Sequence, residues 1–358
     1  MNAPWTAWGD PAAEKVAGHL LEGLTQDLLK AWGRLLDGLL VVGGYGRGEG
    51  SLLRTSIGGY RPWNDVDLVL LRRPGEAPPA GWHGQADAWA AHWDLDSVDL
   101  VWAGPAEWRR RPSSLFHVEV RAGHRVLWGS GAAAELLPAG LARGERLREA
   151  HWLLANRGFA LLLLGLPGLL TGQRAGASFR LNALLKARLA VGDARLLAQG
   201  RLPLRYAERP AALRSLGAPA EVLAAHAGAV ELKLRPTEAW ASAPRDVPAE
   251  ARAAARLWLA HGPLALAGTD AAGYPGYVAA RLGSWRRRLR RALAGGGGRA
   301  LEPAARLGAG VPLLMAGFAE PAGWDPAPLA ALWPGEVSPD APWSQAAARL
   351  CEKWLEGK

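Results

Sequence analysis

Apolar residues near the start of the chain recur every three or four positions, which predicts an amphipathic helix over Ala12–Leu36. The residues on its apolar face are Val16, Leu20, Leu21, Leu24, Leu28, Leu29 and Trp32. A short apolar run, Leu39–Val42, predicts a strand that ends where two glycines follow. The glycine-rich residues 43–50 then predict a flexible turn that leads into a short helix.

Two further apolar runs predict strands, Asp65–Leu71 and Val98–Ala103, and Gln85–Trp93 between them has a helical pattern. The segment Arg125–Trp128 predicts an additional edge strand. Helices and strands thus alternate through about the first 130 residues, an order typical of a compact mixed α/β unit.

From residue 145 onward the pattern changes to helical segments rich in Leu, Ala and Arg. These segments are Glu149–Leu164, Arg180–Gln199 and Ala249–Ala260. We therefore predict an α/β protein with a mixed sheet flanked by helices over residues 1–144 and an all-helical C-terminal domain over residues 145–358. Four consecutive glycines, Gly295–Gly298, predict a loop or hinge in the second domain.

Composition changes this picture little. Hydrophobic residues make up 49% of the chain and charged residues 21%, which excludes an extensively disordered protein. The 42 Lys and Arg exceed the 33 Asp and Glu, giving a net charge of +9. A nucleic-acid partner is only weakly supported by this excess, because the basic residues are scattered along the chain.

Three features predict a cytoplasmic protein with no membrane segment. The single cysteine, Cys351, cannot form an internal disulfide. Asp10 and Glu14 interrupt the N-terminal region where a signal peptide needs an unbroken apolar stretch. The longest apolar run, Phe159–Leu170, has 12 residues, whereas a membrane-spanning helix needs ~20.

Carboxylates on the predicted strands indicate a metal site. Asp65 and Asp67 stand two positions apart, so they project from one face of a strand and can share divalent cations. A third carboxylate on a neighbouring strand can bind a second metal ion and accept the proton of an attacking hydroxyl. Asp94, Asp96 and Asp99 compete for this role, and Asp99 is preferred because apolar strand residues follow it directly.

The glycine-rich turn provides the matching phosphate site. Gly43 and Gly44 allow the main chain to approach phosphate groups, and Arg47 can add a charge-assisted bond. Together with the carboxylates, this turn predicts a seat for a nucleoside triphosphate and two magnesium ions.

The series G-G-Y-G-R-G-E, then D-V-D-L and later V-D-L, resembles the signature of the DNA polymerase β superfamily of nucleotidyltransferases over Leu39–Gly129. It is similar to the uridylyltransferase domain of the bacterial nitrogen-signalling enzyme and to smaller bacterial nucleotidyltransferases. The resemblance implies a small mixed sheet flanked by helices and a magnesium-dependent transfer of a nucleoside monophosphate from a nucleoside triphosphate to a hydroxyl, with release of pyrophosphate. The family's roles fall here on Gly43, Gly44 and Arg47 for the phosphates and on Asp65, Asp67 and Asp99 for magnesium and catalysis.

The resemblance extends to Arg180–Gly200, which is similar to the helical segment after the catalytic domain in small bacterial relatives. Lys186, in this segment with Asp193, is in a position to contact a phosphate. The acceptor stays open between a small molecule, a protein side chain and an RNA end. The alternative is a non-catalytic module that binds a nucleotide or RNA on the same fold.

Overall fold

The computed structural model describes residues 3–110, 113–170, 176–267, 311, 314–320, 322, 324, 337–338 and 340–356. The predicted loop or hinge at Gly295–Gly298 lies outside these residues. The chain forms two compact units. Unit 1 comprises residues 1–146, 202–212 and 227–244, and unit 2 comprises residues 147–201, 213–226 and 245–358. Unit 1 therefore includes two segments of the region for which we predicted a separate helical domain.

Unit 1 contains a small mixed sheet, as the order of apolar runs indicated. Its strands are β1 (Leu36–Val41), β4 (Asp65–Arg72), β5 (Ser97–Ala103) and β6 (Arg125–Gly129), in the order β5-β4-β1-β6. The neighbours β4 and β5 are parallel, whereas β1 pairs antiparallel with both β4 and β6. The mixed α/β class is confirmed at this level.

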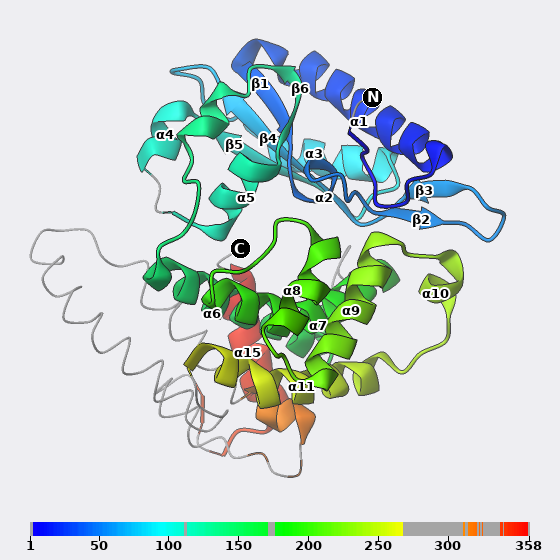
Figure 1. Cartoon of the computed structure of the whole chain (residues 1–358), viewed down its shortest axis with the longest axis vertical. Coiled ribbons are helices and arrows are strands. Elements are labelled where there is room, and N and C mark those ends of the chain that lie inside the picture. The colour runs from blue at the N-terminus through cyan, green and yellow to red at the C-terminus, as the bar shows by residue number, and fades with distance from the viewer. Residues whose placement is uncertain are drawn as a thin grey trace, which may run out of the picture. The chain divides into compact units, whose positions relative to one another are not determined.

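Helices cover both faces of the sheet (Figure 1). On one face α1 (Pro11–Trp32) and α3 (Trp82–His92) form the larger apolar core with the strands. On the other face α4 (Pro105–Arg110), α5 (Leu115–Gly123) and the 3-10 helix η2 (Ala132–Leu136) contribute to a smaller core. Strands β1, β4 and β5 therefore contribute residues to both cores, whereas β6 packs against the larger one.

The N-terminus of α1 illustrates why this helix begins where it does. The Asp10 side chain accepts a hydrogen bond from the Ala12 amide at 2.8 Å, and Pro11 occupies the first helical position. The seven apolar residues that define the predicted helical face extend from Val16 to Trp32, and the helix ends at Trp32. The 3-10 helix η1 (Gly33–Leu35) then leads directly into β1.

The glycine-rich turn differs from the prediction. The helix comes first, as α2 (Gly43–Gly46), and starts at the first glycine instead of following the turn. The segment after it is an antiparallel hairpin of β2 (Leu52–Arg54) and β3 (Tyr60–Pro62), which sequence reasoning did not foresee. Strands of three residues carry too little alternation to be recognised from sequence.

The regular secondary structure of unit 2 is helical in the residues that the structure describes. Helix α6 (Arg143–Leu163) leads into it, followed by the 3-10 helix η3 (Pro167–Leu169), α7 (Ala177–Ala198), α11 (Val247–Ala267) and α15 (Trp343–Glu356). Helices α7 and α11 pack against each other. Between α7 and α11 along the chain lie η5 (Tyr206–Glu208), α8 (Arg209–Ser215), α9 (Ala220–Leu234) and α10 (Glu238–Ser242).

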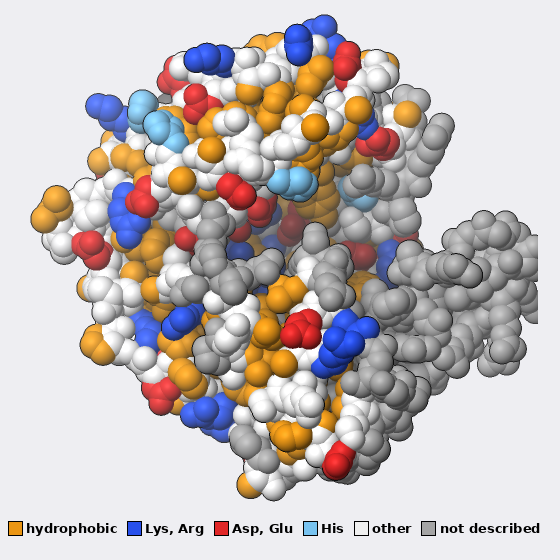
Figure 2. All heavy atoms as spheres, turned by 180° about the vertical axis from the view of Figure 1, so that it is seen from behind, with side chains coloured by type: hydrophobic (Ala, Val, Ile, Leu, Met, Phe, Trp, Pro, Cys, Tyr) orange, Lys and Arg blue, Asp and Glu red, His pale blue; other side chains and the backbone are white. Residues whose placement is uncertain are grey.

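On the face seen in Figure 2, the described Lys and Arg side chains are interspersed with Asp and Glu. A single basic patch of the kind that binds nucleic acid is not visible among the described residues on that face. Of the helices that the structure describes, none combines the length and the apolar character needed to span a bilayer.

Candidate functional site

Two of the predicted carboxylates project from the same face of β4. Val66, Leu68 and Leu70 of this strand pack into the core formed with α1 and α3. Asp65 and Asp67 alternate with them and therefore point to the opposite side of the sheet. Both aspartates are half-buried.

Asp99 lies beside Asp67 on the neighbouring strand. The parallel register pairs the two residues directly, and parallel strands are spaced about 4.8 Å apart. Asp99 is exposed. Of the competing residues, Asp96 precedes β5, and Asp94 has a left-handed φ of 53° and an exposed ion pair with Arg61 at 3.1 Å. The register therefore favours Asp99 as the third carboxylate.

Gly43 lies in direct contact with the carboxylate of Asp67. The residue has a φ of +60°, a conformation that side chains disfavour. A Cβ added to Gly43 would lie 2.0 Å from Oδ2 of Asp67 and 3.0 Å from its Cγ. The main chain at the start of α2 can approach this carboxylate only because residue 43 is glycine.

The first turn of α2 presents backbone amides beside the same strand. The N–H groups of Gly43, Gly44 and Tyr45 lie where an α-helix offers no internal acceptor. The Tyr45 hydroxyl is buried and donates a hydrogen bond to the Ser51 carbonyl at 3.1 Å. Burial, and to a smaller extent the negative charge of Asp65, raise the pKa of Tyr45 well above its usual value. Tyr45 therefore supports the turn as a neutral side chain.

Arg47, predicted to contact phosphate, lies near two carboxylates and an aromatic ring. Its Nε lies 3.9 Å from the Glu49 carboxylate, and one terminal nitrogen lies 3.8 Å from Glu119. Only 6% of the side chain is exposed, and the guanidinium lies 5.4 Å from the centre of the Tyr206 ring. In the structure the charge of Arg47 is thus balanced by two carboxylates within a buried cluster.

Glu49, which sequence reasoning did not single out, organises this cluster. It is 2% exposed and accepts hydrogen bonds from the amides of Tyr206 and Ala207 at 2.8 and 3.0 Å. Arg209 and Lys233 also lie over the Tyr206 ring, at 3.7 and 5.0 Å. Glu49 therefore connects the glycine-rich turn to residues 202–212 of the same unit. The only sequence signal for this role was an acidic residue inside a glycine-rich turn.

Lys186 belongs to unit 2, where it lies half-buried on α7. Asp193 on the same helix is 4% exposed, and its Oδ1 lies 3.0 Å from Nε2 of the fully buried His226. Asp193 thus forms a buried pair within unit 2. The carboxylates of unit 1 and Lys186 come from different units.

The three carboxylates fit magnesium by chemical type, because hard cations prefer carboxylate oxygens. Asp65 and Asp67 share one face, and Asp99 is the register partner of Asp67. Within the described part of the chain, however, no three His, Cys, Asp or Glu side chains are gathered closely enough to form a ready-made metal cage.

Comparison with protein-family models produced no match for this chain. Comparison with curated proteins likewise revealed no significant relative.

Proposed function

We propose that unit 1 is a magnesium-dependent nucleotidyltransferase. The observation that carries this proposal is the contact between the backbone at Gly43 and the carboxylate of Asp67, with Asp99 beside it in register. A helix turn that provides free backbone amides next to a row of carboxylates has the two parts needed to hold a triphosphate and its cations.

Each residue then has a defined task. Asp65 and Asp67 would hold magnesium, which supplies charge neutralisation on the phosphate oxygens. The amides of Gly44 and Tyr45 bind phosphate oxygens, and Gly43 keeps the approach to Asp67 open. Asp99 would hold the second ion and accept the proton of the acceptor hydroxyl.

The reaction is an in-line substitution at phosphorus. The acceptor oxygen forms a bond to the α-phosphorus, the bond from that phosphorus to the bridging oxygen breaks, and pyrophosphate leaves. The acceptor is a small molecule, a protein hydroxyl or an RNA end. Arg47 acts indirectly in this scheme, because its charge is engaged by Glu49 and Glu119 and it fixes the turn.

A second function has one observation in its favour. Since the described carboxylates do not already form a metal cage, the same fold could bind a nucleotide without transferring it. The two functions differ in whether the bound nucleotide is transferred to an acceptor.

The test is a thermal-denaturation panel with each nucleoside triphosphate, with and without magnesium. A ligand at 100 times its Kd stabilises the folded state by about 2.7 kcal/mol, which raises Tm by several degrees. We expect this shift for the wild type, its loss in Asp67→Asn, and its retention in Asp94→Asn, whose carboxylate is 75% exposed.

Transfer is then assayed as pyrophosphate release with acceptors of the three classes. A Tm shift that is the same in Asp67→Asn as in the wild type contradicts the metal role of Asp67. A metal-dependent shift without transfer to any acceptor class supports the binding module instead.

A further inference from the structure

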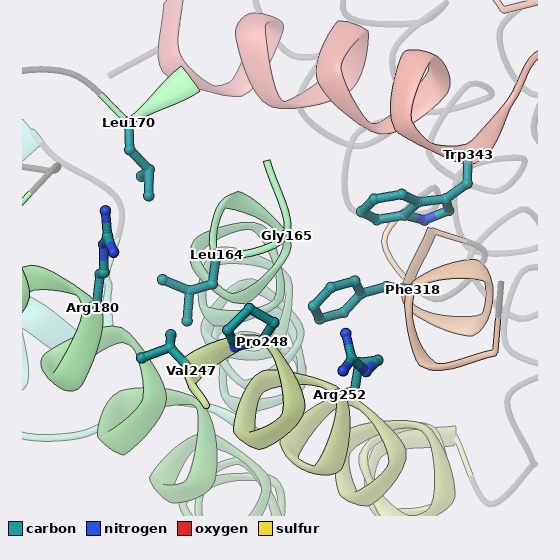
Figure 3. A pocket seen from close by; sticks show the side chains of 9 residues that line it. All are labelled: Leu164, Gly165, Leu170, Arg180, Val247, Pro248, Arg252, Phe318 and Trp343. Atoms are coloured by element: carbon teal, nitrogen blue, oxygen red, sulfur yellow. The ribbon is translucent and has the colours of Figure 1, made fainter. Parts of the chain in front are cut away.

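Unit 2 contains a cavity of about 290 Å³ that the proposed transfer reaction does not use. Leu164 and Gly165 after α6, Val247 and Pro248 at the start of α11, and Leu170 form most of its apolar wall (Figure 3). The volume is at the lower end of the range for small-molecule sites, which are mostly apolar with a few polar groups.

A pair of stacked aromatic rings closes one side of the cavity. The rings of Phe318 and Trp343 lie 5.3 Å apart at an angle of 21°. The backbone at Gly165 packs tightly against both, since a Cβ there would lie 2.5 Å from Phe318 and 3.2 Å from Trp343. The indole nitrogen of Trp343 donates a hydrogen bond to the Leu314 carbonyl at 2.8 Å. These contacts hold the aromatic wall in place.

Two arginines also line the cavity, Arg180 from α7 and Arg252 from α11. In Figure 3 they lie on opposite sides of Leu164 and Pro248, with Arg252 next to Phe318. Neither guanidinium forms a salt bridge or hydrogen bond with any residue that the structure describes. Nε of Arg180 is buried without a hydrogen-bond partner.

Arg180 differs in this respect from other arginines of the protein. Arg47, Arg72 and Arg146 also have a buried Nε without a partner, but each of them uses another guanidinium nitrogen in an ion pair or a hydrogen bond. Arg180 is half-buried as a whole, and its buried Nε has no hydrogen-bond partner among the described residues. A buried donor without a partner is costly, and an anion bound in the cavity would supply the missing acceptor.

We propose that this cavity binds a small aromatic anion. The aromatic body lies along Leu164 and Pro248 against the Phe318–Trp343 pair, and the acidic group takes the hydrogen bonds of Arg180. Arg252 adds a second positive charge that selects for an anion over its neutral analogue. A carboxylate and a phosphate monoester share this chemistry.

The test is isothermal titration calorimetry of the full chain with indole-3-acetate, its neutral amide and phenyl phosphate. We expect indole-3-acetate or phenyl phosphate to bind with 1:1 stoichiometry, and the better of the two identifies the head group. The amide should bind roughly tenfold more weakly or not at all, because it lacks the charge. This comparison uses only the wild-type protein, so it does not depend on the folding of a variant.

Variants then locate the site. Arg180→Gln should weaken the binding of the acid roughly tenfold or more, and Arg252→Gln by a smaller factor. Arg195→Gln, on the same helix as Arg180 but not part of the cavity wall, should leave it unchanged.

Three results overturn the proposal: neither acid binds at millimolar concentration, the acid and the amide bind equally, or Arg180→Gln binds as the wild type does. Because no nucleotide or magnesium is present in these titrations, their outcome is independent of the transferase proposal.

Discussion

Replacing Gly43 by alanine tests the closest contact of the candidate site. The added Cβ would lie 2.0 Å from Oδ2 of Asp67, whereas ordinary van der Waals contact begins at 3.4 Å. The carboxylate must therefore move by about 1.4 Å, the difference between these two distances, or the helix turn must shift. Either movement changes the position of the Asp67 carboxylate relative to the backbone amides of α2.

The expected loss of stability has two parts. Alanine in the left-handed region costs about 1–2 kcal/mol, and forcing the Asp67 side chain away from its preferred rotamer adds roughly 0.5–1.5 kcal/mol. The free energy of unfolding should thus fall by about 1.5–3.5 kcal/mol. The effect on transfer is expected to be larger, because a misplacement of about 1 Å in a reacting constellation can cost ~100-fold in rate.

The variant Gly9→Ala separates the backbone cost from the cost of the clash with Asp67. Gly9 has a φ of +65°, close to that of Gly43, but a Cβ there meets nothing within 4 Å. Urea unfolding should therefore report only the backbone cost of about 1–2 kcal/mol for Gly9→Ala. The magnesium-dependent nucleotide shift should persist in Gly9→Ala and disappear in Gly43→Ala.

A double-mutant cycle with Asp67→Ala isolates the collision. Asp67→Ala removes Oδ2 and Cγ and leaves Cβ, which is 3.3 Å from the Cβ added at Gly43. The cost of Gly43→Ala should then fall to that of Gly9→Ala, giving a coupling energy of roughly 0.5–1.5 kcal/mol. Equal costs for Gly43→Ala and Gly9→Ala in the wild-type background, with no coupling to Asp67, would refute the reasoning.

Two further changes test other parts of the molecule. Glu49→Ala should lower the free energy of unfolding by about 3 kcal/mol in urea, because two amides and Arg47 lose a buried partner. Burial lowers the pKa of His151 from 6.5 to about 4, so the unfolded chain binds its proton more readily. Stability from this group is complete above pH 6.5 and decreases toward pH 4 by up to about 3 kcal/mol, and His151→Gln should flatten that slope.

Each of these two changes has its own control. The side chain of Glu231 is 63% exposed, so Glu231→Ala should change the free energy of unfolding by less than about 1 kcal/mol. If Glu49→Ala loses no more stability than Glu231→Ala, Glu49 has no special role. Parallel curves of stability against pH for the wild type and His151→Gln would show that other groups cause the acid dependence.

The local elements could be predicted from the sequence because their signals are local. The spacing of Leu20, Leu24 and Leu28 specifies the buried face of α1, and the alternation in Asp65–Leu71 specifies which side of β4 the aspartates occupy. The candidate carboxylates and glycines could be named for the same reason. The three-residue strands β2 and β3 were missed because so short a run has no recognisable period.

Tertiary structure decided which distant residues meet. The parallel register of β4 and β5 places Asp99, and not Asp94 or Asp96, next to Asp67. No sequence period encodes that register, because it depends on how both strands pack against α1 and α3.

Tertiary structure also decided which charged groups pair with one another. Arg47 and Glu49 are neighbours of the glycines in sequence, yet their partners Glu119 and Tyr206 come from segments far along the chain. Side-chain chemistry alone made Arg47 a candidate phosphate ligand, whereas folding surrounds it with carboxylates. The sequence thus determines the elements and the chemical groups they carry, and long-range packing determines which of those groups neutralise each other and which remain available to a ligand.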